Sequence, residues 1–222
     1  MVTAVTTARK VLGRCPGRPA LERVQSRVVP IRWRSFTAEG RKHRYFVHPY
    51  NPTWRSERAV EIPLALDFLA RTPGRGVEIG NVLDHYVPTT HRRVDKYEVA
   101  PGVENIDVLD LRSDPLDWIV AISTLEHVGW DESPRDPTKA VRAVEHLRAL
   151  LRPEGRLFLS VPVGHNPGLD AAMRAGLDGT VRSIGLVRGP RSRWTEVDKL
   201  PDVAYDVERH AARAVWIGEL TA

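Results

Sequence analysis

Short apolar runs alternate with amphipathic stretches along most of the chain. Apolar residues recur at the spacing of one helix face in residues 57–70, and residues 136–151 carry the clearest helical stripe. Apolar runs between and after these stretches predict strands at 76–80, 92–97, 103–108, 117–123 and 156–162. Because strands that alternate with helices form parallel sheets, the pattern predicts an α/β fold with a doubly wound, mostly parallel sheet.

The last third of the chain is less regular. Arg152-Pro153-Glu154-Gly155 is expected to end the second helix. Residues 165–200 are richer in Gly, Pro and Arg, so we expect loops there with a small helix at 169–175. The region 204–220 contains an apolar string that predicts a final strand.

Charge separates the N-terminal quarter from the rest. Residues 1–60 hold 13 Lys or Arg against 3 Asp or Glu, whereas the whole chain carries a net charge of +5. Residues 1 to about 40 lack a sustained apolar period and predict irregular chain, and the aromatic residues of 45–54 predict a segment that docks. We therefore expect a basic, partly disordered N-terminal extension or lid, residues 1–56, followed by one domain, residues 57–222.

Composition excludes several classes of protein. Cys15 is the single cysteine, so neither an internal disulfide nor a cysteine-based zinc site can form, which fits a reducing cytoplasm. No apolar run approaches the roughly 20 residues that a membrane span needs, and the apolar stretch at the start is too short for a secretory signal. We expect a cytoplasmic protein with no membrane partner.

Two segments carry the chemistry. Residues 76–86, GVEIGNVLDHY, predict a buried strand whose end places the Glu78 carboxylate and the unhindered backbone of Gly80 at a sheet edge. Residues 117–128, DWIVAISTLEHV, predict a second buried strand that ends in polar groups. Together the segments resemble the class I S-adenosylmethionine (SAM)-dependent methyltransferases, and STLEHV at 123–128 is the closest part of the match.

The resemblance implies a Rossmann-like domain with SAM as cofactor. Glu78 and Gly80 would lie by the methionine part, Asp95 would hold the ribose hydroxyls, the pair 107–108 would meet adenine, and 123–124 would close the pocket. The implied cofactor-binding residues are Glu78, Gly80, Asn81, Asp95, Asp107, Val108, Ser123 and Thr124. Each acid also has a structural alternative, because acids after strands often cap helices or form turns.

The cofactor loop departs from the family pattern. Val82 and Asp84 stand where further glycines are usual. Only 17 residues separate Glu78 from Asp95, and Pro88 interrupts them, so the helix between must be short or broken. We expect a divergent but working loop.

An oxygen nucleophile gains from a base that removes its proton, and histidine suits that role near neutral pH. His127 has the best position, although the histidine of this string is often structural in the family. A metal ion is not expected, because only the scattered Asp131, Asp136 and Asn166 could contribute ligands. The catalytic candidates are His127, His85 and His165.

These features predict a methyltransferase that acts on oxygen or nitrogen of a small molecule, and a homodimer could complete its acceptor pocket. The 28 Arg against 5 Lys suggest a GC-rich bacterial genome, where such enzymes often modify sugars or secondary metabolites. One alternative is an RNA methyltransferase, favoured by the basic N-terminal segment. Another is a non-catalytic SAM-fold binding protein, favoured by the missing glycines. A nicotinamide oxidoreductase would need glycine within 82–84.

Overall fold

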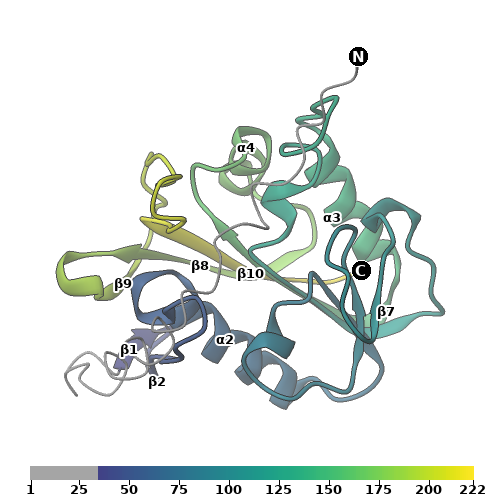
Figure 1. Ribbon diagram of the computed structural model, residues 1–222, viewed down its shortest axis with the longest axis horizontal. Helices are drawn as coiled ribbons and strands as arrows, with labels where there is room; N and C mark the ends of the chain where they lie inside the picture. Colours follow the sequence, from purple (N-terminus) through teal and green to yellow (C-terminus); the bar gives the residue numbers. More distant parts are fainter. Residues whose placement is uncertain (1–34) are drawn as a thin grey trace.

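A computed structural model of the protein describes residues 35–222, and what was expected of residues 1–34 lies outside this part. An eight-stranded sheet with the order β5-β4-β3-β6-β7-β10-β8-β9 forms its centre (Figure 1). Strands β5 to β7 are parallel, β10 is antiparallel to both of its neighbours, and β9 is antiparallel to β8. In sheet order the strands are β5 Val103–Glu104, β4 Arg92–Val94, β3 Gly76–Ile79, β6 Leu116–Ile122, β7 Leu151–Pro162, β10 Ala214–Leu220, β8 Thr180–Arg188 and β9 Trp194–Val197.

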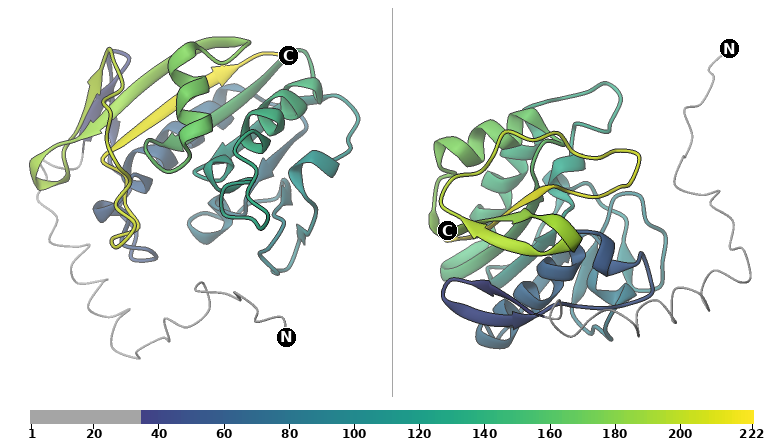
Figure 2. Two further views of the ribbon diagram at one scale, coloured as in Figure 1. Left: turned by 90° about the horizontal axis from the view of Figure 1, so that it is seen from above. Right: turned by 90° about the vertical axis from the view of Figure 1, so that its left-hand side faces the viewer.

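Helices cover both faces of this sheet (Figures 1 and 2). Helix α2, Arg58–Arg71, packs on the face that carries Trp118 and Val120. Helices α3, Lys139–Ala149, and α4, Pro167–Ala175, pack on the opposite face. Since alternate residues of β6 enter the two cores, the strand is buried on both sides, which explains its continuous apolar run. Short 3-10 helices follow several strands: η3 Leu83–His85, η4 Val108–Asp110, η5 Leu125–His127 and η6 Pro190–Ser192.

The five strands predicted between 76 and 162 correspond to β3 to β7, although β7 already starts at Leu151, inside the range expected for the helix. Strands β8 and β9 form where loops were expected. Residues 180–184 alternate between half-buried and exposed positions, and the apolar stretch that follows, 184–187, is short and is bounded by Arg188. No helix within residues 35–222 is long and apolar enough to cross a membrane.

Residues 35–56 pack onto the domain. Strands β1, Ser35–Ala38, and β2, Arg41–Arg44, form an antiparallel hairpin where irregular chain was expected up to about residue 40, and Phe36 is buried in the core. The following aromatic segment docks as expected: the backbone N–H of Trp194 donates to the Tyr45 hydroxyl at 2.8 Å. It also contains η2, Thr53–Arg55. A domain boundary at residue 56 stays a prediction.

Candidate active site

Polar loops follow β3, β4, β6 and β7 at one edge of the sheet, because the carboxyl ends of parallel strands meet there. Gly80 makes the first turn with φ of +84°. Its N–H donates to the Val94 carbonyl at 2.7 Å, and a Cβ added at this residue would lie 2.3 Å from Thr124 Oγ1. A glycine therefore lets the ends of β3, β4 and β6 approach closely, and Thr124 borders this turn.

Glu78 supports the loop from below. Its carboxylate is completely buried and accepts hydrogen bonds from the N–H groups of Val82 and Leu83, both at 2.8 Å. Its other oxygen lies 2.8 Å from His91 Nε2. Both oxygens are thus engaged within the protein, and Glu78 acts here as an anchor for residues 80–83. Contact with the methionine part of a cofactor stays a prediction.

The glycine-poor loop is closed by η3 and by an ion-pair network. Buried Asn81 donates to Glu98 at 2.8 Å, and Arg93 pairs with Asp84 at 2.5 Å. His85 also contacts Glu98, at 3.0 Å. A single 3-10 turn with charged side chains thus replaces the expected helix between β3 and β4. Arg93 and Glu98 were missed by the sequence argument, because their apolar or loop surroundings gave no sign of these partners.

His85 and Tyr86 pack against the aromatic segment 45–54. The Tyr50 ring stacks on His85 with centroids 4.8 Å apart, and Phe46 and His48 meet Tyr86 edge-on. Burial raises the pKa of Tyr86 to about 12. The segment lies over the loop after β3, and the Tyr50 ring covers one face of His85. Its role as a lid stays a prediction.

Asp95 stands at the end of β4 with a turn of its own. Its Oδ1 accepts from the N–H groups of Tyr97 and Glu98 at 2.8 and 2.7 Å. Both of these bonds end at the same oxygen, and within residues 35–222 no hydrogen bond to Oδ2 is present. Asp95 is half-buried, so this oxygen is suited to accept from a ligand hydroxyl.

Asp107 lies at the N-terminus of η4 beside buried Val108. Its Oδ2 lies 2.6 Å from Lys139 Nζ and 2.8 Å from Lys96 Nζ, and Glu132 bridges the same two lysines. Partial burial by itself would raise the pKa of Asp107, but the hydrogen bonds from the lysines outweigh it and lower the pKa to about 2. The predicted adenine position is therefore occupied by a charge-balanced cluster.

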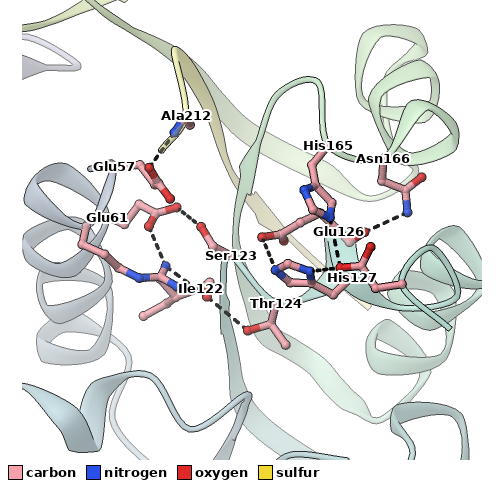
Figure 3. Close-up of polar contacts among 12 residues, drawn as sticks. Glu57, Glu61, Ile122, Ser123, Thr124, Glu126, His127, His165, Asn166 and Ala212 are labelled. Atoms are coloured by element: carbon pink, nitrogen blue, oxygen red, sulfur yellow. Dashed lines mark hydrogen bonds and ion pairs between the residues drawn. The ribbon is translucent and has the colours of Figure 1, made fainter. Parts of the chain in front are cut away.

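A buried group of charged residues joins α2 to the end of β6 (Figure 3). Glu61 accepts from Arg58 at 2.7 Å and from the Ser123 hydroxyl at 2.5 Å. Ser123 has φ of +40°, so its side chain is turned toward α2 by a strained backbone. Glu57 accepts from the Ala212 N–H at 2.8 Å. The sequence argument missed Arg58 and Glu61, which look like ordinary helix-surface residues.

Glu126 is buried in η5 with only 1% of its surface exposed. Burial raises the pKa of its carboxyl well above the usual value. Within residues 35–222, its Oε2 has no hydrogen-bond partner. Its backbone carbonyl accepts from the Asn166 side chain at 3.1 Å, which ties the loop after β6 to the loop after β7.

His127 and His165 meet across these two loops (Figure 3). The rings lie edge to face with centroids 4.6 Å apart. Asp131 Oδ2 lies 2.5 Å from His127 Nδ1 and 3.3 Å from His165 Nε2. Burial by itself would raise the pKa of Asp131, but the hydrogen bond and charge of His127 outweigh it and lower the pKa. Of the three predicted histidines, the structure thus brings two together, whereas His85 contacts other residues.

No family model matches the chain, and no curated protein matches it in sequence. Solved structures do resemble it. The N-methyltransferase NodS from Bradyrhizobium japonicum WM9 is 16% identical with a TM-score of 0.44, over 71% of this chain and 90% of NodS. A TehB-like SAM-dependent methyltransferase from Corynebacterium glutamicum is 13% identical with a TM-score of 0.41, over 72% and 86%. Magnesium protoporphyrin IX methyltransferase from Synechocystis PCC 6803, with bound SAM, is 14% identical with a TM-score of 0.39, over 78% and 80%.

Each of these three proteins is named as a methyltransferase, at sequence identities too low to transfer a substrate. The fold assignment follows from the protein's own strand order. Five parallel strands are followed by an antiparallel β10 inserted between β7 and β8. The chain has the Rossmann-like, doubly wound and mostly parallel α/β fold that its sequence predicted.

Proposed function

We propose that the protein is a SAM-dependent methyltransferase that methylates oxygen or nitrogen of a small molecule. The main support is the edge formed by β3, β4 and β6, where Gly80 allows close backbone approach and half-buried Asp95 keeps one carboxylate oxygen for a ligand. A doubly wound sheet binds its ligand at this edge.

The residues at the edge fit the cofactor in part. Asp95 is suited to accept from ribose hydroxyls, and the backbone at Gly80 can lie beside the methionine part. Asp107 would have to exchange a lysine contact before its side chain could meet adenine. When bound, SAM supplies a methyl group on a positively charged sulfur, which is a good leaving group.

The acceptor would lie on the side of the loops after β6 and β7. An acceptor hydroxyl must lose its proton, and the cluster of His127, Asp131 and His165 offers the groups that can promote this. Residues 45–54 cover Tyr86 nearby, which favours a small acceptor such as a sugar or secondary metabolite. We place the reaction in the cytoplasm, with a second copy of the chain as a candidate partner.

Isothermal titration calorimetry of the whole chain with SAM and with S-adenosylhomocysteine tests the proposal. We expect both to bind at micromolar concentrations and NAD not to bind. If neither SAM nor S-adenosylhomocysteine binds, the proposed function is refuted.

A non-catalytic SAM-fold binding protein is the second candidate. It is favoured by the internal partners of Glu78 and Asp107, which already satisfy carboxylates that a cofactor would use. Binding of SAM without methyl transfer to any member of a broad acceptor panel would support this candidate over the first.

A further inference from the structure

Three residues converge beside the proposed acceptor position: His127, Asp131 and His165 each offer a donor atom, and these atoms lie within 4.8 Å of one another. Asp131 Oδ2 lies between His127 Nδ1, at 2.5 Å, and His165 Nε2, at 3.3 Å. We propose that they form a binding site for a divalent transition-metal ion. The site lies at the carboxyl ends of β6 and β7 and was not foreseen from the sequence, which separates His165 from the other two by more than 30 residues.

The donor set selects the kind of ion. Two imidazole nitrogens and one carboxylate oxygen suit Zn²⁺, Fe²⁺, Co²⁺ or Mn²⁺, and three protein ligands leave coordination positions open for water or substrate. Mg²⁺ and Ca²⁺ prefer sets made of oxygen only. We therefore expect zinc or cobalt to bind far more tightly than magnesium.

A carboxyl group lies behind His127, as is common for histidines that bind metal ions. Its second ring nitrogen, Nε2, lies 3.5 Å from Glu126 Oε1. Histidines that bind metals commonly donate this second N–H to a carboxylate, which fixes the tautomer and the ring orientation. Glu126 is 1% exposed and keeps Oε2 unpartnered within residues 35–222, so a buried carboxyl group stands directly behind the ring.

The two ligand-bearing loops are already fixed to each other. The Asn166 side chain caps α4 by accepting from the N–H groups of Gly168 and Leu169, and it donates to the Glu126 carbonyl. The N–H of Asp131 donates to the His127 carbonyl at 3.0 Å, which places both side chains on one side of a turn. Little ordering therefore remains to be done when an ion binds.

An ion can enter with a small adjustment. The side chains of His127 and Asp131 are 40% and 48% exposed, so the site is open to solvent. Ligands about 2.0–2.1 Å from one ion lie about 3.0–3.4 Å from each other. The 2.5 Å contact between His127 and Asp131 must therefore open by somewhat less than 1 Å, and the exposed carboxylate is free to swing.

The use of the ion rests on the proposed function. An ion at this position would lower the pKa of an acceptor hydroxyl. The hydroxyl proton would pass to water, the oxygen would form the new bond to the methyl carbon, and the carbon–sulfur electron pair would stay on sulfur. His127 would then act as a ligand of the ion and not as the free base.

Direct binding measurements test the site. Chelator-treated full-length protein without a histidine tag is titrated with Zn²⁺, Co²⁺ and Mg²⁺, and Co²⁺ binding is also followed by its visible absorption. We expect one Zn²⁺ or Co²⁺ per chain, with affinity lowered at least about 100-fold in His127→Ala, Asp131→Asn and His165→Ala, and about 10–100-fold in Glu126→Gln.

His85→Ala and Asp136→Asn are the matched controls, because they remove an imidazole and a half-exposed carboxylate outside the cluster. Their metal affinity should equal that of the wild type. Metal binding that is absent, or equal in the ligand and control variants, would overturn the site. SAM affinity measured in chelator keeps the two proposals separate: loss of SAM binding alone refutes the function, and loss of metal binding alone refutes the site. Thermal unfolding of each variant confirms that it is folded.

Discussion

Gly80→Ala tests how the first turn of the site is built. A non-glycine residue in the left-handed region costs about 1–2 kcal/mol, and Gly80 has φ of +84°. The added Cβ would also lie 2.3 Å from Oγ1 and 2.9 Å from Cγ2 of Thr124. Overpacking of this kind costs about 1–3 kcal/mol, so we expect a total loss of about 2–5 kcal/mol in the free energy of unfolding.

Gly40 provides a control for the backbone term. It has φ of +70°, and a Cβ added there meets nothing within 4 Å, so Gly40→Ala should cost only the strain of about 1–2 kcal/mol. Thr124→Ala removes the two atoms that lie under 3 Å from the added Cβ and leaves only its own Cβ, at 3.2 Å. In that background, Gly80→Ala should therefore cost about as much as Gly40→Ala.

Urea unfolding of the single and double variants measures these differences as a double-mutant cycle. We expect a coupling of about 1–3 kcal/mol between Gly80 and Thr124. If the effects of the two substitutions are additive, or if Gly80→Ala costs no more than Gly40→Ala, then the packing of β3 against β6 does not explain this glycine.

Three further outcomes follow from the site. Asp95→Ala should weaken SAM binding by about 1–3 kcal/mol in calorimetry, whereas Asp110→Ala, at an exposed position, should leave it unchanged. If a folded Asp95→Ala protein binds SAM as tightly as the wild type, Asp95 does not hold the ribose. His127→Ala should keep SAM affinity within a few-fold and lower turnover by about 10²–10⁴-fold; a rate near wild type per folded, SAM-loaded molecule would make this histidine structural. The pKa of Asp107 is about 2, below its ordinary value of 3.8, so its ion pairs stabilise the fold above about pH 4 and are lost as pH falls toward 2. Between pH 4 and pH 2 the free energy of unfolding should therefore fall by about 1–2 kcal/mol less in Asp107→Asn than in the wild type. Identical acid unfolding curves for the two proteins would show that the lysines do not stabilise the carboxylate.

The central part of the fold could be predicted because its signals are local. The run 118–122 is apolar since β6 is buried on both faces, and Gly80 is required by a turn whose close approach leaves no room for a side chain. Strand β8 was not predicted because its conformation depends on pairing with β10, which is distant in the sequence. Its own sequence has only a short apolar stretch, 184–187, between Arg182-Ser183 and Arg188.

The site was predicted less completely for the same reason. Asp95 and Asp107 follow strands and could be proposed from position alone, but the lysines that hold Asp107 come from different parts of the chain. The convergence of His127 and His165 depends on the pairing of β6 with β7 and on the Asn166 contact between their loops. Such relations between distant residues leave no periodicity in a single sequence.

The place of β10 in the sheet has a consequence for synthesis of the protein. This strand is buried at every residue and separates β7 from β8, yet it follows both in the chain. During translation, β7 and β8 therefore emerge from the ribosome before the strand that joins them. Until β10 arrives, each presents unpaired backbone groups that can recruit a strand from another nascent chain. A chaperone that shields these strands during elongation should raise the yield of native protein more than one added after release.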